Sequence, residues 1–531
     1  MRKASSPTPI AVFGLSLAFW LGAIALAPSP SMAEDLAVGT GARFDTLDPH
    51  QMNSAPNAMV GLHLFEPLVH LASGLPAPGL ALSWRTIDDT AWEFKLRPDV
   101  VFHDGSPFTA DDVIATMNRI LSKPRGESLG FRQQIEGMVE LTAPDPLTLV
   151  IRTSRPDPTM PRRLFAINII PRHLAAATSA EFDSGEAAVG TGPFKLVSWK
   201  PGEFVEFAAF DRHWAGLPRW DKVTISVEHD NAQRVAALSI GRVQLIDQVP
   251  PADIDRLARN PALGVFNAVS TRVLVLHPDH SRDRTPYVSD LDGRPLSRNP
   301  LKDVRVRQAI SKAIDRTDIA QGLFSGRALP AGQLLSAGFG VDPRIEVDRF
   351  DPAEAKALLD AAGWGDGFRL TLHCPSDRYV NDEQVCGTLA RMLGRVGIRV
   401  AVEAMPSVEF FPRLARHEFS LAFFGWGALA GDVSDTLLNL LAGPNCAQGW
   451  GAANAGRYSN REFDQTLDRA MASFDEKRRE ALLRQAVGIA MGDMAVIPLY
   501  YPMNHWAARR PVAFPARGDD LTLATDAYLS R

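Results

Sequence analysis

This chain of 531 residues has no excess of basic charge, few cysteines and few long apolar runs. Its 56 Lys and Arg residues face 61 Asp and Glu residues, so the formal net charge is −5. Because phosphate contacts require an excess of basic residues, this balance argues against a nucleic-acid-binding protein. Hydrophobic residues make up 46% of the chain, an ordinary globular composition that excludes a disordered protein. The length predicts about two to four domains.

The one long apolar run lies at the start of the chain. Two basic residues are followed by the uncharged stretch 10–26, then by two prolines and the small residues that lead to Ala33. This order is typical of a secretory signal peptide, and we predict cleavage after Ala33 and export to the periplasm. An uncleaved membrane anchor is the alternative, although the run is short for a span and prolines follow it at once. No later run is comparable, so we expect a soluble mature protein.

Only three cysteines are present, at positions 374, 386 and 446. In an oxidising compartment, Cys374 and Cys386 could pair and leave Cys446 over, since the first two lie within one short β-to-α segment. Three small buried thiols are an equal alternative. Neither the cysteines nor the 12 histidines show the CxxC or HExxH spacing of metal sites, so we expect no metal and no cofactor.

Motifs of common catalytic sites are also missing. The sequence contains no GxSxG motif, no SxxK triad context and no phosphate-binding P-loop. The segment 190–193 (GTGP) is too short for a nucleotide-binding loop and predicts a turn. Asp and Glu pairs are plentiful, but none has a spacing that indicates acid–base catalysis. We therefore do not expect an enzyme, and a secreted hydrolase is the remote alternative.

Residues 351–430 show the clearest secondary-structure pattern. Strands expected at 368–374, 398–402 and 419–424 are separated by helices expected at about 382–396 and 407–417. Such short links require parallel strands with right-handed crossovers, and the almost wholly apolar third strand predicts burial on both faces. Because open sheets of this kind bind ligands beyond the carboxyl ends of their strands, we expect a site at three loops. These loops are 375–381, 405–406 and 425–435.

The first of these loops contains Arg378 and Tyr379. Arg378 offers a planar, always charged guanidinium that suits a carboxylate, and Tyr379 could pack against a ligand side chain. The alternative is a solvent-facing arginine in a surface loop.

The third loop contains Trp426, Asp432 and Asp435 among several glycines. Trp426 either covers the core or faces a cleft, and the glycines allow the backbone to approach a ligand closely. An ammonium group could be held by Asp432 or by Asp435. Asp432 is equally well explained as a loop residue. We expect Asp435 to cap a helix over 436–441.

Several stretches share a characteristic order and spacing that covers nearly all of residues 36–505. They are 64–69 (LFEPLV), 80–84 (LALSW), 92–113 (WEFKLRPDVVFHDGSPFTADDV), 190–194 (GTGPF), 304–310 (VRVRQAI) and 457–460 (RYSN). In these stretches the chain resembles the extracytoplasmic solute-binding proteins of peptide and nickel ABC importers, often called family 5.

The resemblance implies an α/β fold of the type II periplasmic binding protein class, in which two lobes close about a hinge and carry an extra inserted domain. It implies a discontinuous lobe I of residues 34–63, 190–272 and 495–531. The inserted domain would be residues 64–189, and lobe II would be residues 273–494.

The resemblance also implies ligand-binding residues. Dipeptide-binding members carry a P-x-x-R…N loop whose arginine binds the peptide carboxylate, and Pro375, Arg378 and Asn381 match it. A G-W-x-G-D-x-x-D-P loop binds the amino terminus, and the segment 425–435 is similar, although its first aspartate is three residues later and Thr436 replaces the proline. The implied ligand-binding set is Arg378, Tyr379, Asn381, Trp426, Gly427 and Asp432.

The function implied is that of a monomeric solute-binding component of an ABC importer. It would capture a short peptide or peptide-like solute in the cleft between the lobes and deliver it to the permease and its ATPase. A different cargo is the first alternative: a nickel chelate, an opine, an oligosaccharide or haem. A sensor or chaperone without a transporter is a further alternative.

Overall fold

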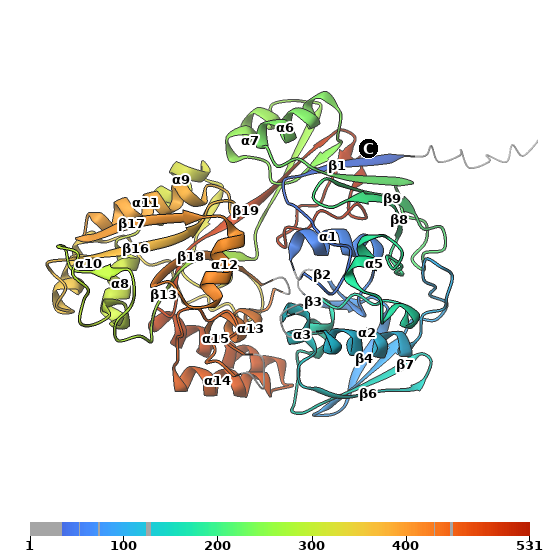
Figure 1. Ribbon diagram of the computed structural model, residues 1–531, viewed down its shortest axis with the longest axis horizontal. Coiled ribbons are helices and arrows are strands. Elements are labelled where there is room, and N and C mark those ends of the chain that lie inside the picture. Colours follow the sequence, from blue (N-terminus) through green and yellow to red (C-terminus); the bar gives the residue numbers. More distant parts are fainter. Residues whose placement is uncertain are drawn as a thin grey trace, which may run out of the picture.

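The computed structural model describes residues 34–52, 54–72, 75–123, 129–428, 431–445 and 450–530. The predicted signal peptide and Cys446 lie outside these ranges. The described chain forms two large β-sheet parts, which share one long strand, and a smaller third sheet (Figure 1). We call them sheets 1, 2 and 3.

Sheet 1 lies on the right in Figure 1 and has the strand order β19-β11-β1-β10-β9-β8, with β12 also paired to β19. Strands β1, β10 and β11 are parallel, and the other pairs are antiparallel. The strands are β1 (Asp35–Thr40), β8 (Phe194–Lys200), β9 (Phe204–Ala209), β10 (Lys222–Val227), β11 (Leu245–Ile246), β12 (Leu263–Val269) and β19 (Ile497–Arg509). This part also contains α1 (Ala55–Leu64), α6 (Asn231–Ile240), α7 (Pro251–Ala258), β20 (Val512–Ala513) and β21 (Tyr528–Leu529).

Sheet 3 is built by strands that lie between residues 81 and 153, within the segment predicted as the inserted domain, residues 64–189, which we call the insert region. Its antiparallel order is β4-β5-β7-β6, and alternating residues of β5 (Trp92, Phe94 and Leu96) are buried against α2 and its neighbours. The elements are β2 (Val69–Ala72), β3 (Leu75–Pro78), β4 (Ala81–Asp88), β5 (Ala91–Leu96), α2 (Ala110–Ser122), α3 (Leu129–Ile135), β6 (Met138–Asp145), β7 (Thr148–Thr153), α4 (Met160–Leu164), η1 (Arg172–Leu174) and α5 (Ser179–Asp183).

Sheet 2 has the order β17-β16-β18-β13-β19, with β14 paired to β16 and β15 paired to β19. Its strands are β13 (Arg272–Pro278), β14 (Val288–Ser289), β15 (Ala328–Pro330), β16 (Phe368–Pro375), β17 (Ile398–Met405) and β18 (Leu421–Gly427). Its helices are η2 (Pro300–Lys302), α8 (Val304–Lys312), α9 (Arg316–Phe324), α10 (Pro352–Ala361), α11 (Asp382–Gly394), α12 (Ser407–Ala415), α13 (Val433–Thr436), η3 (Leu437–Leu441), α14 (Arg461–Met471) and α15 (Glu476–Gly492).

The predicted parallel unit is confirmed. Strand β16 pairs in parallel with both β17 and β18, and α11 and α12 make the connections. Strand β18 is buried on both faces, since Leu421 and Phe423 enter one apolar core and Ala422 and Phe424 enter another. The strand begins two residues later and ends three residues later than predicted. Because β13 pairs with it as far as Gly427, the loop that we expected at 425 begins after Gly427.

Strand β19 connects the two large parts (Figure 1). Its residues 497–500 pair with β13, whereas its residues 503–509 pair with β12. Strands β12 and β13 are themselves joined by Ser270 and Thr271, and the Ser270 N–H donates to the Pro502 carbonyl at 2.9 Å. Two adjacent chain crossings therefore join sheets 1 and 2, which is the connection that a hinge between them requires.

Cys374 and Cys386 form a disulfide, so of the two alternatives that the sequence left open, the structure adopts the disulfide between these two cysteines. The bond ties the carboxyl end of β16 to α11 and closes the segment that contains Arg378. None of the helices in the described ranges has the length and apolar composition needed to cross a membrane.

Candidate ligand-binding site

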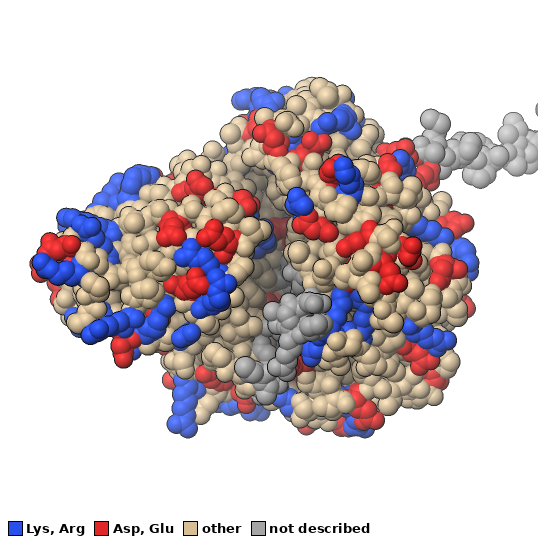
Figure 2. Space-filling model, in the orientation of Figure 1, with Lys and Arg blue, Asp and Glu red and all other residues tan. Residues whose placement is uncertain are grey.

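A cavity of about 1050 Å³ lies where the three parts of the molecule meet (Figure 2). Residues from 48 to 62 line it from the sheet 1 side, and residues from 131 to 168 of the insert region line it as well. Sheet 2 contributes residues of the predicted loops 375–381 and 425–435. The third predicted loop, 405–406, is not part of the lining, although α12 after it contributes Phe411 and Leu414.

Arg378 is solvent-accessible in this cavity. The loop that carries it is held by Asp382 in the first turn of α11, whose Oδ2 accepts the N–H groups of Arg378 and Tyr379 at 3.0 and 3.1 Å. Desolvation by the surrounding protein, and secondly the charge of Arg272, lower the pKa of Arg378, which nonetheless stays a cation. Among the described residues, Arg378 has no carboxylate partner.

The other arginines that line the cavity are paired. Arg272 is 2.9 Å from Asp520, and Arg155 is 3.3 Å from Asp468. Arg163 forms an ion pair with Asp157, and Arg162 with Asp432. Arg378 is therefore the lining arginine whose charge the described part of the chain leaves for a ligand.

Tyr379 and Asn381 have supporting contacts. The Tyr379 hydroxyl accepts the Gly425 N–H at 2.8 Å, so this side chain joins the first loop to the end of β18 while its ring lines the cavity. Asn381 is not part of the lining: its side-chain amide donates to the Leu323 carbonyl at 2.8 Å, and its φ of 59° makes the turn into α11. The structure thus does not bring Asn381 to the site predicted for it.

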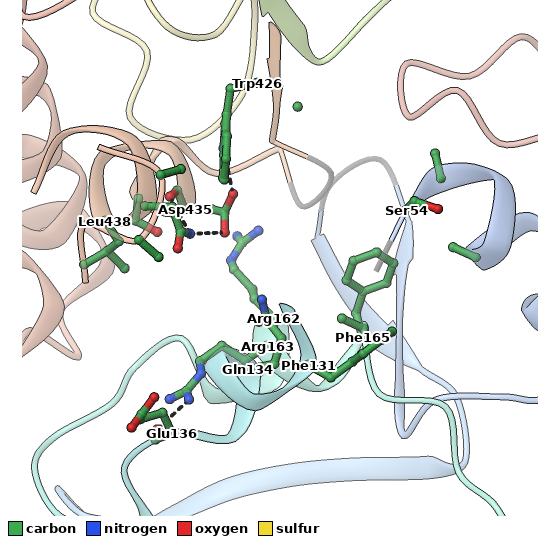
Figure 3. A pocket seen from close by; sticks show the side chains of 18 of the residues that line it. Ser54, Phe131, Gln134, Glu136, Arg162, Arg163, Phe165, Trp426, Asp435 and Leu438 are labelled. Carbon is green, nitrogen blue, oxygen red and sulfur yellow. Dashed lines mark hydrogen bonds between the residues drawn. The ribbon is translucent and has the colours of Figure 1, made fainter. Parts of the chain in front are cut away.

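Trp426 and Gly427 end β18 and line the cavity, as expected. The Trp426 indole Nε1 donates to Asp435 Oδ2 at 3.2 Å, and Figure 3 shows the two side chains together on one wall. Trp426 therefore faces the cavity and also orients a carboxylate.

Asp432 lines the same wall, but it is only 1% exposed and is engaged by two arginines. Its Oδ2 lies 3.0 Å from Arg479 Nη2 and 3.4 Å from Arg162 Nε. Its Oδ1 accepts the Ser434 N–H at 2.8 Å, which makes Asp432 the cap of α13. The prediction that Asp435 caps a helix at 436 is therefore wrong, because Asp432 starts the helix three residues earlier and places Asp435 inside it.

Among the described residues, Asp435 receives side-chain hydrogen bonds from neutral groups, from Trp426 and from Asn439 Nδ2 at 3.0 Å. Burial, with a further contribution from the charge of Asp432, raises the pKa of Asp435 to about 6, although the Trp426 hydrogen bond opposes the shift. Asp435 has no cationic partner within the described ranges.

The sequence did not indicate the insert-region residues of the site. Arg162 comes from α4, and Figure 3 shows its side chain pointing toward Asp435 and Trp426 across the cavity. Phe131, Glu136 and Phe165 line the same wall. These residues follow no motif or spacing, so their approach to residues 426–435 depends on tertiary packing alone. Within the described ranges, no group of three or more His, Cys, Asp or Glu residues could hold a metal ion.

A two-sheet α/β fold with a shared crossing strand and a cavity between its parts defines a solute-binding protein of the periplasmic type. Residues 76–447 match the family model described as bacterial extracellular solute-binding proteins, family 5, so the chain belongs to this family. The predicted family, and with it the class of extracellular solute-binding proteins, is confirmed.

Individual relatives support the same classification. The glutathione-binding protein GsiB of Salmonella paratyphi A is 27% identical over 501 residues, which cover 90% of this chain and 92% of the relative. Among solved structures, DppA of Helicobacter pylori in complex with the peptide STSA has a TM-score of 0.80 at 22% identity and covers 94% of this chain and 98% of its own. AgaA of A. tumefaciens R10 in complex with agropinic acid has a TM-score of 0.78 at 23% identity, with 94% and 99% covered. These structural likenesses confirm the predicted type II periplasmic binding protein fold.

Proposed function

We propose that this protein captures a short peptide or peptide-like solute with a free carboxylate and delivers it to the permease of an ABC importer. The observation that carries the proposal is the cationic Arg378, which faces a cavity of about 1050 Å³ and has no carboxylate partner in the described chain. A bidentate, charge-assisted contact between this guanidinium and a ligand carboxylate would compensate both charges.

The names of the relatives agree with this class of ligand. One is named for glutathione, which is a tripeptide, and one was solved with the peptide STSA. An opine-like ligand is the second candidate, because AgaA was solved with agropinic acid. Both kinds of ligand carry carboxylates, so Arg378 suits either, and binding measurements must separate them.

The remaining parts of the proposal concern the whole chain. We propose cleavage after Ala33 on export to the periplasm, a monomeric mature protein, and binding without chemical turnover. We also propose the lobe boundaries given above, in which residues 273–494 move against residues 34–63, 190–272 and 495–531 while residues 64–189 form the inserted domain. Amino-terminal sequencing of the exported protein tests the cleavage site, and recovery of unaltered ligand tests the absence of turnover.

The central experiment is calorimetry on the purified mature protein with glutathione, a panel of di- and tripeptides, agropinic acid and a nickel–histidine chelate. We expect tight binding of at least one peptide. Arg378→Ala should weaken that binding by about 2–5 kcal/mol, or about 30-fold to several thousand-fold, if the contact is desolvated. The same peptide with an amidated carboxyl terminus should bind the wild-type protein similarly weakly.

Arg294→Ala is the matched control, because Arg294 is 76% exposed, pairs with Asp290 and Asp292, and does not line the cavity. Its peptide affinity should equal that of the wild type. Binding of the chelate or the opine in the absence of any peptide binding would contradict the peptide proposal. Unchanged affinity of the Arg378→Ala variant for every ligand would remove the role of Arg378.

A further inference from the structure

The carboxylate of Asp432 is not available to a cationic ligand group. Its Oδ2 lies within 3.4 Å of two guanidiniums, those of Arg479 and Arg162, and the exposed side-chain fractions of the three residues are 2%, 5% and 9%. This buried triad carries a net charge of +1. An ammonium group brought to Asp432 would meet two cations, and it would have to displace Arg162 or Arg479 from a desolvated ion pair.

Asp435 offers what Asp432 lacks. Asp432 is the N-cap of α13 and Asp435 lies in its first turn, so the two carboxylates are neighbours, and the charge of Asp432 acts on Asp435. Asp435 lines the cavity, and the hydrogen bonds that it accepts from side chains of the described residues come from neutral donors on Trp426 and Asn439. A carboxylate has about four acceptor positions, so these bonds orient Asp435 without saturating it.

We propose that Asp435, rather than Asp432, binds the amino group of the ligand, because Arg162 of the insert region and Arg479 already pair with Asp432. The inference rests on the proposed function and makes it more specific. The ligand is a peptide or peptide-like solute with a free primary amine at Asp435 and a free carboxylate at Arg378. Trp426, through its hydrogen bond to Asp435, is a positioning residue for the amine.

The raised pKa of Asp435 fits this role. Burial and the charge of Asp432 raise it to about 6, so at pH 7 the site presents an ionised carboxylate without a cation, which a ligand ammonium would compensate. Its charged neighbour on the same helix is Asp432, which caps that helix and pairs with Arg162 of α4 and Arg479 of α15. Arg378 and Glu136 are further charged residues that line the cavity.

The test compares each ligand with its N-acetyl form. Glutathione and N-acetylglutathione, and Met-Leu and N-acetyl-Met-Leu, are titrated into the wild type and into Asp435→Asn. Wild type should prefer the free amine by about tenfold or more, and Asp435→Asn should lose this preference while its affinity for the acetylated form changes less than about twofold. Between pH 7 and pH 5, wild type should lose about tenfold in affinity for the amine form only, as Asp435 takes up a proton.

Glu136→Gln is the matched control. Glu136 is a second lining carboxylate without an ion-pair partner among the described residues, but it lies on the opposite wall, where Arg163 donates to its backbone carbonyl at 2.6 Å (Figure 3). This variant should keep the wild-type preference for the free amine. Asp432→Asn should keep the preference too, even if its overall affinity or stability falls.

The outcomes separate this inference from the proposed function. Wild type that binds neither form of any peptide contradicts both. Wild type that binds the free and acetylated forms equally well contradicts only the assignment of an amine site. If Asp432→Asn or Glu136→Gln loses the preference for the free amine and Asp435→Asn keeps it, another carboxylate binds the amine and the role of Asp435 is overturned. Equal weakening of both forms by Asp435→Asn reduces that role to a structural one. The pH dependence of the wild type decides the matter even if a variant does not fold.

Discussion

The two aspartates of the segment 431–435 differ in the cations around them. Asp432 is paired with two arginines, whereas Asp435 has only neutral hydrogen-bond donors among the described residues. Ionisation of a buried carboxylate without a cation disfavours the native state, because water solvates the charge better in the unfolded chain. A ligand-binding carboxylate of this kind costs stability until the ligand arrives.

We therefore predict that Asp435→Asn raises the unfolding free energy of the ligand-free protein, relative to wild type, by more at pH 8 than at pH 4. The native pKa of about 6 exceeds the ordinary 3.8, so the native state holds the proton more tightly than the unfolded state. The resulting loss of wild-type stability is absent below about pH 4 and fully present above about pH 6, with a size of about 1–3 kcal/mol. Urea unfolding of both proteins at the two pH values measures the difference.

The comparison between pH values isolates the charge. The loss of a hydrogen bond from Trp426 or Asn439 in the variant is nearly independent of pH and cancels. If the difference in unfolding free energy between the two proteins is the same at pH 4 and pH 8, Asp435 is not an uncompensated charge.

At the scale of elements, the binding loop after β16 is held at both ends. Cys374 in β16 and Cys386 in α11 are fully buried and bonded, and Asp382 binds the backbone of the loop between them. Arg378 therefore projects from a closed, short segment. A constrained loop loses little conformational entropy when it binds a ligand, which favours affinity.

We expect the double variant Cys374→Ala/Cys386→Ala to lose about 2–3 kcal/mol of unfolding free energy, because the bond closes a loop with a sequence separation of only 12. Its peptide affinity should fall as well, since the loop without the disulfide would lose more conformational entropy when it binds the ligand. Chemical denaturation and calorimetry measure the two effects, and reduction of the wild-type protein should reproduce both. Equal stability of the oxidised and reduced wild-type protein would contradict a structural role for the bond.

At the scale of the whole molecule, several contacts cross from the insert region to the helices that follow β18. Arg162 reaches Asp432, Arg155 lies 3.3 Å from Asp468, and the rings of Trp92 and Phe474 lie 5.9 Å apart. Sheets 1 and 2 are meanwhile joined by adjacent crossings at Ser270 and Pro502. These contacts lie on the far side of the cavity from the crossings, so they favour the closed arrangement.

Arg162→Ala should shift the ligand-free protein toward an open form. The variant loses a buried contact between two parts but leaves Asp432 paired with Arg479, so we expect about 1–2 kcal/mol less stabilisation of closure, or about a 5- to 30-fold change in the ratio of the two forms. Small-angle scattering should show a larger radius of gyration than for wild type. The control is Arg85→Ala, because Arg85 pairs with Glu93 within sheet 3. An identical radius for all three proteins would contradict a role in closure.

The sequence by itself determined the parallel β16-β17-β18 unit, because periodicity and short links between elements are local properties of the chain. Through motifs that resemble those of a known family, it determined the family and the fold class. It also placed Arg378 and Trp426 at strand ends that line the cavity. Only the tertiary structure decided that Arg162 pairs with Asp432 and that Asp435 has no cationic partner among the described residues. It also decided that Asn381, at the start of α11, bonds to Leu323 and does not line the cavity. Arg162 is 270 positions before Asp432 and belongs to another part of the molecule, and no local pattern encodes which distant side chains packing brings together.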